Sequence, residues 1–167
     1  MASNKKYILT REVAEKKLQR MAYEIVERNP GEGHIILAGI TKSGLVIANK
    51  ITDFLKPVYK GELYLIEITL DKKNPSDVYF SPFVDFNDKV VIVADDVVNT
   101  GRTLLYALKP FLLHYHPKKI QTLVLVERTH KAFPVTSDYV GLSVATTFQE
   151  HIVVEIDNNQ IQGAYMT

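Results

Sequence analysis

The stretch VVIVADDVVNTGRT, residues 90–103, decides the fold and holds the main candidate site. Its first five residues, Val90 to Ala94, are apolar and mostly β-branched, which is typical of a strand covered on both faces in a parallel sheet. The change to Asp95-Asp96 predicts the carboxyl end of that strand. We therefore expect both acids to face whatever the protein binds there.

The residues after the two acids predict an anion-binding turn. Thr100 and Thr103 supply hydroxyls, Gly101 lacks a Cβ, and a helix beginning near Thr103 exposes unpaired N–H groups. The alternative is a plain strand-to-helix turn with solvated acids and a capping threonine.

A carboxylate and a phosphate repel each other unless another group lies between them, and a ribose ring fits that position. Its 2′- and 3′-hydroxyls would donate to the acids, while its 5′-phosphate would lie on the turn. The predicted ribose-5-phosphate site contains Asp95, Asp96, Val97, Val98, Asn99, Thr100, Gly101, Arg102 and Thr103, with Asp95 and Asp96 as the catalytic pair.

Composition sets broad limits. A chain of 167 residues with 46% hydrophobic and 23% charged residues is typical of one globular domain, and no apolar run is long enough to cross a bilayer. Cysteine is absent, and no apolar segment follows the polar start Met1–Lys6, so we expect a cytoplasmic protein without disulfides. The net charge of +1 gives no general argument for nucleic acid, although Lys16, Lys17 and Arg20 share the first helix.

Hydrophobic periodicity predicts an α/β fold, with a doubly wound, mostly parallel sheet and a small C-terminal hood. A helix capped by Thr10 is expected to end near Asn29, and the remaining boundaries follow from Gly, Pro and polar clusters. We predict strands at 34–38, 63–70, 90–94 and 120–126, a helix at 45–55, and one domain over 1–167 with a core at about 8–126, a flexible lid at about 71–85 and a hood at about 127–167.

The order of strand, acid pair and Thr-Gly-Arg-Thr resembles the signature of the type I phosphoribosyltransferases, which bind phosphoribosyl pyrophosphate. The resemblance implies a pyrophosphate-binding loop after the first core strand, and a non-proline cis peptide near Lys42-Ser43. In this chain, glycines, hydroxyls and a lysine stand in that loop: Gly39, Thr41, Lys42, Ser43 and Gly44.

The same resemblance suggests further contacts. Lys72 and Lys73 could reach the diphosphate when the lid closes and excludes water. Phe148 and His151 are candidate base contacts in the hood. Mg²⁺ is the implied cofactor, held through water by Asp95, Asp96 and Asp157.

Several separate segments are similar to one branch of this family, the bifunctional pyrimidine-operon regulators with uracil phosphoribosyltransferase activity. This resemblance implies transfer of phosphoribosyl to uracil, giving UMP and diphosphate, and a homodimer or higher homo-oligomer. The segments are Ile8-Leu9, Glu27-Arg28-Asn29, Glu67–Leu70, Glu127–His130 and Asp138–Gly141.

Two alternatives stay open. A purine (hypoxanthine or guanine) phosphoribosyltransferase typically has an aspartate just before the Thr-Gly turn, but this chain has Asn99, and an amide cannot accept a proton at neutral pH. An RNA-binding regulator with weak or no catalysis is the other. The chain has Gln19, Tyr23 and Leu142 on the surface that is basic in that branch, and its short lid lacks arginine.

Overall fold

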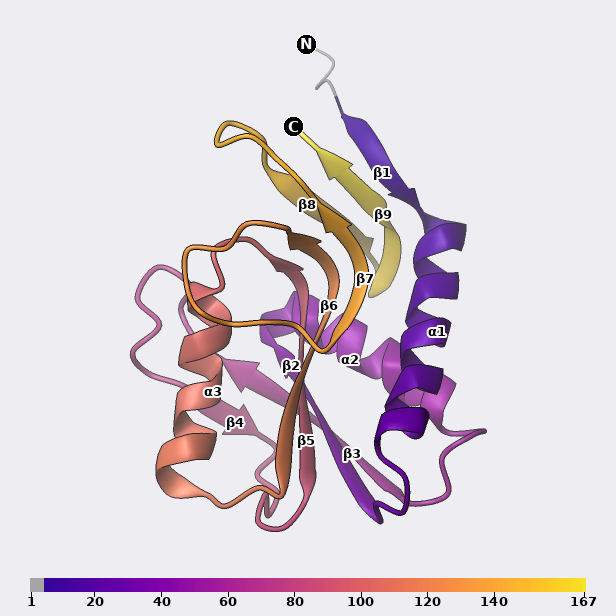
Figure 1. The fold of residues 1–167 in the computed structure, drawn as a ribbon, viewed down its shortest axis with the longest axis vertical. Helices are drawn as coiled ribbons and strands as arrows, with labels where there is room; N and C mark the ends of the chain where they lie inside the picture. The colour runs from indigo at the N-terminus through magenta and orange to yellow at the C-terminus, as the bar shows by residue number, and fades with distance from the viewer. Residues whose placement is uncertain (1–4) are drawn as a thin grey trace.

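The computed structural model describes residues 5–167, which form two sheets and three helices (Figure 1). The larger sheet has six strands in the order β4-β3-β2-β5-β6-β7, and every neighbouring pair is parallel except β3 with β4. Its strands are β2 (His34–Ile40), β3 (Glu62–Thr69), β4 (Tyr79–Ser81), β5 (Val90–Val98), β6 (Lys119–Arg128) and β7 (Tyr139–Val144).

Helices cover both faces of this sheet, as the sequence predicts. α1 (Arg11–Arg28) and α2 (Thr41–Leu55) pack on one face, and α3 (Arg102–His114) packs on the other (Figure 1). The side chains of β5 alternate between the two cores, because successive strand residues point to opposite faces. Val90, Ile92 and Ala94 join the α1/α2 core, whereas Val91 and Val93 join the α3 core. None of the helices within residues 5–167 is long and apolar enough to span a bilayer.

The chain reverses its direction of winding between β2 and β5. From β2 it passes through α2 to β3 on one side, and it then returns to β5 on the other side of β2. In open α/β sheets, ligands bind at such a switch point, outside the carboxyl ends of the strands. The predicted phosphate-binding turn after β5 and the predicted pyrophosphate segment after β2 both lie there.

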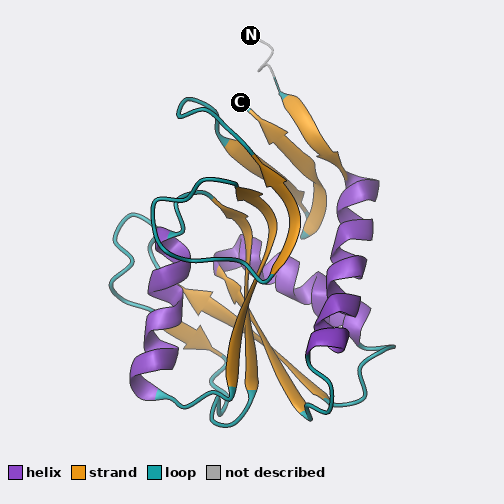
Figure 2. Cartoon of the chain, in the orientation of Figure 1, coloured by secondary structure: helices purple, strands orange, loops and turns teal. Residues whose placement is uncertain are grey.

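The hood differs from the sequence expectation. It is a separate antiparallel sheet of β1 (Lys6–Thr10), β9 (Gln160–Met166) and β8 (Ile152–Asp157), in the order β1-β9-β8. The segment expected to open the hood at Glu127 instead extends β6, and β7 continues the central sheet. The connection from β6 to β7 contains no helix (Figure 2), so the usual sign of a parallel crossover is missing from the sequence.

The predicted lid is partly ordered by pairing. β4 lies inside it and runs antiparallel to β3, with Phe80 opposite Ile68. The Phe80 ring packs 4.7 Å from the Phe111 ring and 5.1 Å from the Phe86 ring, measured between centroids. β4 therefore interrupts the predicted lid, and residues 71–78 and 82–85 lie outside the sheet. A three-residue strand is too short to produce a readable alternation.

Gly44 is expected to control the contact of α2 with the sheet, and Gly33 provides a comparison. A Cβ on Gly44 would lie 2.7 Å from the Ala94 carbonyl oxygen, whereas one on Gly33 would meet nothing within 4 Å. Gly44→Ala should lower the free energy of unfolding by about 1–3 kcal/mol, because backbone must move to admit the methyl group. Gly33→Ala should change it by less than about 1 kcal/mol. Urea denaturation of both variants measures this difference, and equal stabilities would contradict the packing described.

Candidate functional site

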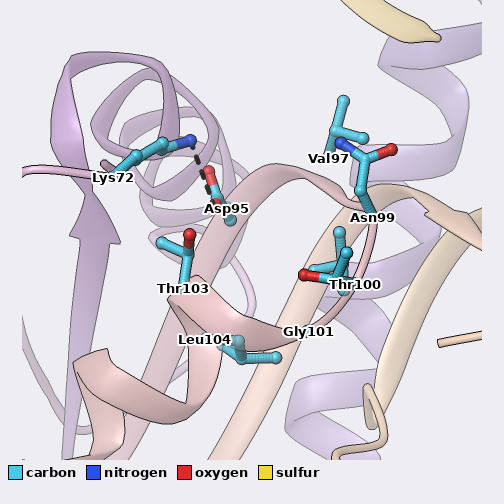
Figure 3. A pocket seen from close by; sticks show the side chains of 9 residues that line it. Lys72, Asp95, Val97, Asn99, Thr100, Gly101, Thr103 and Leu104 are labelled. Carbon is cyan, nitrogen blue, oxygen red and sulfur yellow. Dashed lines mark ion pairs between the residues drawn. The ribbon is translucent and has the colours of Figure 1, made fainter. Parts of the chain in front are cut away.

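Asp95 is a buried carboxylate near the end of β5. Its exposed fraction is 2%, its Oδ1 accepts a hydrogen bond from the Asp96 N–H at 2.8 Å, and its Oδ2 lies 3.7 Å from Lys72 Nζ (Figure 3). Burial raises the pKa of Asp95 well above its usual value, and the nearby Asp96 charge raises it further. A charged group this poorly solvated lowers the stability of the fold, and groups of this kind are concentrated at functional sites.

Asp96 is placed differently from its neighbour. The sequence predicts that the strand ends at the acids, but β5 continues to Val98, so the two side chains point to opposite faces of an extended strand. The Asp96 Oδ1 accepts the Val97 N–H at 2.8 Å. Asp95 lines the pocket at this edge, and Asp96 does not.

The turn after β5 has the features of an anion site. Gly101 has a φ of +87°, a left-handed conformation that favours glycine, and α3 begins at the next residue with no side-chain cap. Thr100 Oγ1 accepts the Arg102 N–H at 3.2 Å. The N–H of Leu105 makes the first helical bond to the Gly101 carbonyl, so the amides of residues 103 and 104 precede that bond and are available to an anion.

The acid and the turn share one pocket of about 380 Å³, including its open mouth (Figure 3). Lys72 and Asp95 are its charged residues, and Thr100 and Thr103 supply hydroxyls. Arg102, also predicted here, does not line it. The lining residues are Lys72, Asp95, Val97, Val98, Asn99, Thr100, Gly101, Thr103 and Leu104.

The segment after β2 is not a loop, which corrects the sequence expectation. Gly39 belongs to β2, and α2 begins at Thr41, whose φ is +57°. This is a strained conformation for a β-branched residue, and such strain is concentrated at functional sites. The first turn of α2 has no side-chain cap, and its Gly44 packs against the backbone of β5 next to Asp95. Glycine is needed here for close packing.

The hydroxyls of this helix start are close together, with Thr41 Oγ1 3.4 Å from Ser43 Oγ, and Lys42 is exposed. The expectation of a cis peptide bond between Lys42 and Ser43 is wrong. Within residues 5–167 the one cis bond joins Ser81 to Pro82.

Besides Asp96, Arg102 and the residues at the start of α2, four more predicted site residues lie outside the pocket. Lys73 is exposed and donates its N–H to Asp71. The Phe148 side chain is 99% exposed, and His151 pairs with Thr167 through backbone bonds, at the end of the hood that lies away from the central sheet (Figure 1). Asp157 ends β8. Within residues 5–167 no three acidic or histidine side chains form a metal cluster, so Asp95, Asp96 and Asp157 do not make one.

The loop between β6 and β7 holds the turn in place, which the sequence did not predict. The N–H groups of Ala132 and Phe133 both donate to the Thr100 carbonyl, at 3.1 and 3.0 Å. Val135 lies against Gly101, where an added Cβ would be 2.5 Å from it. No local pattern identifies these contacts, because they join segments about thirty residues apart.

Comparison with known proteins agrees with this geometry. Residues 6–159 match the phosphoribosyl transferase domain family. The chain is 37% identical to the bifunctional protein PyrR of Clostridium acetobutylicum over 89% of each chain. It is 34% identical to that of Pelotomaculum thermopropionicum, over 96% of this chain and 95% of the relative.

Solved structures share the fold at lower identity. A hypoxanthine phosphoribosyltransferase of Trypanosoma cruzi aligns with a TM-score of 0.79 and 15% identity, over 96% of this chain and 95% of that one. A hypoxanthine-guanine phosphoribosyltransferase of Bacillus anthracis aligns with a TM-score of 0.76 and 20% identity, over 95% of each chain. The chain has a buried acid beside a helix start at the switch point of the sheet, and it matches the family model and the PyrR relatives over most of its length. It therefore belongs to the type I phosphoribosyltransferase family and is similar to the PyrR proteins within it.

Proposed function

We propose that this chain transfers the 5-phosphoribosyl group of phosphoribosyl pyrophosphate to a nucleobase, with uracil as the preferred acceptor, giving UMP and diphosphate. The observation that carries the proposal is the buried Asp95 carboxylate in one pocket with the uncapped start of α3. The carboxylate accepts ribose hydroxyls, and the turn of Thr100 to Thr103 binds the 5′-phosphate.

The chain contributes mainly orientation. In the reaction the bond from ribose C1′ to the diphosphate oxygen breaks, a bond from C1′ to a base nitrogen forms, and the proton of that nitrogen leaves to water. Positive charge develops on the ring as the first bond weakens, so a fixed carboxylate near the sugar and exclusion of water favour transfer. None of the pocket residues has to act as a nucleophile.

The donor set suits a magnesium ion. Asp95 supplies one hard oxygen donor in the pocket, and Mg²⁺ prefers waters and substrate oxygens in its remaining positions. When bound, the ion would neutralise charge on the leaving diphosphate. We propose that Asp95 holds its waters, with Asp96, on the opposite face of β5, as a candidate for the same role. Asp157, at the end of β8, stays a candidate for the same role.

Uracil is favoured over purines by Asn99, which lines the pocket immediately before the Thr-Gly turn. An amide there cannot act as the base that a purine acceptor requires. The hypoxanthine enzymes among the structural neighbours share under 25% identity, so they support the fold and leave the base open.

RNA binding by α1 has less support than catalysis. Arg20 forms an ion pair with Glu24, and its other nitrogen donates to the Val140 carbonyl at 2.9 Å, so its charge is engaged within the protein. Lys16 pairs with Glu12. A homo-oligomer remains part of the proposal on the strength of the family resemblance, and a cytoplasmic location on the lack of cysteine.

Removing the Asp95 charge should lower the activity and raise the stability of the protein. Asp95→Asn is expected to lower the transfer rate with Mg²⁺ and phosphoribosyl pyrophosphate by roughly 10²-fold or more, because the acceptor for ribose hydroxyls is weakened. It should also raise Tm at pH 8 by roughly 2–6 °C, since a buried charge is removed. Activity assays and calorimetry measure both effects, with the exposed Asp53→Asn as the control.

The pH dependence of this stabilisation follows from the sign of the shift. The folded pKa of Asp95 lies above its unfolded value, so the proton is bound more tightly in the folded state. The group therefore favours folding fully below the unfolded pKa, and this contribution is lost as pH rises through the folded pKa. The stability gap between Asp95→Asn and wild type should widen from pH 4 upward. A gap that narrows would contradict the assignment.

The choice of base can be measured directly. Assays with uracil, orotate, hypoxanthine, guanine and xanthine should give a kcat/KM for uracil roughly tenfold or more above the others. Asn99→Asp should increase the hypoxanthine rate, because a carboxylate restores a proton acceptor. A wild-type preference for a purine would reject uracil and keep the transferase. No transfer to any base would reject the proposed reaction.

A further inference from the structure

Lys72 joins the lid to the pocket. It follows β3 by three residues, at the start of the lid, yet its Nζ lies 3.7 Å from the buried Oδ2 of Asp95 (Figure 3). Within residues 5–167 it is the one cationic group within ion-pair distance of that carboxylate. This ion pair joins the lid to the acid. The Lys72 side chain is 45% exposed, whereas the Asp95 side chain alone is 3% exposed.

The local backbone selects Lys72 over its neighbour. Asp71 Oδ1 accepts the Lys73 N–H at 2.9 Å, and the Asp71 carbonyl accepts the Asn74 N–H at 3.1 Å, which makes a tight turn. In that turn Lys72 lines the pocket, whereas Lys73 is exposed and, within the described chain, forms no ion pair. Two adjacent residues of the same type therefore differ in one contact, and they provide a matched pair for experiment.

The two ends of the lid are held by different forces. At its far end, Phe80 packs in the aromatic cluster under α3 and β4 pairs with β3, so that end belongs to the core. At its near end, residues 72–77 are exposed except for the buried Pro75, and Lys72 joins this end to the pocket through its ion pair with Asp95. A half-exposed ion pair is weak enough to open when another group competes for the carboxylate.

We propose that the Lys72–Asp95 ion pair is a latch, which holds the near end of the lid over the pocket in the ligand-free protein and is released when a divalent cation takes the Asp95 carboxylate. A cation held by that carboxylate and Lys72 Nζ repel each other, so both do not stay on the same oxygen. Occupation of the acid is thereby coupled to movement of the lid. The latch itself rests on the geometry alone, and its release by a cation rests on the proposed function.

Backbone hydrogen exchange of the lid tests the latch by a double-mutant cycle. Lys72→Met and Asp95→Asn should each raise exchange in residues 70–78 by roughly threefold or more, and the double variant should show no further increase. Asp95→Asn keeps an oxygen for the Asp96 N–H, so it removes the charge and spares the local hydrogen bond. Lys73→Met is the matched control and should exchange at the wild-type rate. Peptides from α1 and β5 must stay protected, which separates lid opening from unfolding.

Either of two results would overturn the latch: wild-type lid exchange in Lys72→Met, or effects of the two single substitutions that add in the double variant. Release is tested by adding Mg²⁺ alone, at ionic strength matched with NaCl. Lid exchange in the wild type should rise towards the Lys72→Met level, and exchange in Lys72→Met should not change. A protected wild-type lid at saturating Mg²⁺ would reject release.

These outcomes are distinguishable from failure of the proposed function. A chain that completes the exchange cycle as expected but transfers phosphoribosyl to no base keeps the latch and loses the reaction. A chain that is active, with a lid indifferent to Lys72→Met, keeps the reaction and loses the latch.

Discussion

The close packing of α2 against the end of β5 is the constraint on which the rest of the site depends. Gly44 lies so near the Ala94 carbonyl and the Asp95 Cα that no side chain fits between them. β2 and β5 are paired up to Gly39 and Ala94, so their carboxyl ends lie together at the point where the winding of the sheet reverses. The acid after one strand and the helix start after the other are brought together as a result.

The charge of Asp95 lowers the stability of the folded state. The side chain is buried, its pKa is raised by that burial, and its compensation comes from one backbone N–H and one lysine across the pocket. A site built this way is less stable than an apolar one of the same shape, and it is prepared for a ligand that brings hydroxyls or a cation.

Much of the fold and of the pocket could be predicted from the local sequence. The β-branched run before Asp95 and the Thr-Gly turn predicted the strand, the helix start and the pocket edge, because strand burial and turn chemistry are local properties. Contacts between distant segments could not be predicted from the sequence. Pairing of β1 with β9, the clamp on Thr100 by Ala132 and Phe133, and the reach of Lys72 to Asp95 all join residues far apart in the chain.

The expectations for the end of β5 and the start of α2 were wrong because one local pattern is compatible with more than one structure. The continuation of β5 to Val98 turns Asp96 away from Asp95, whereas a strand ending at the acids would have placed both at the ligand. The glycines after β2 indicated a loop, but they serve helix-to-strand packing.

A crystal structure of the complex with Mg²⁺ and phosphoribosyl pyrophosphate tests the central claim most directly. We expect ribose hydroxyls within hydrogen-bond distance of the Asp95 carboxylate and the 5′-phosphate against the backbone N–H groups of Thr103 and Leu104. A ligand bound with its phosphate away from the start of α3, or with its sugar out of reach of Asp95, would contradict it.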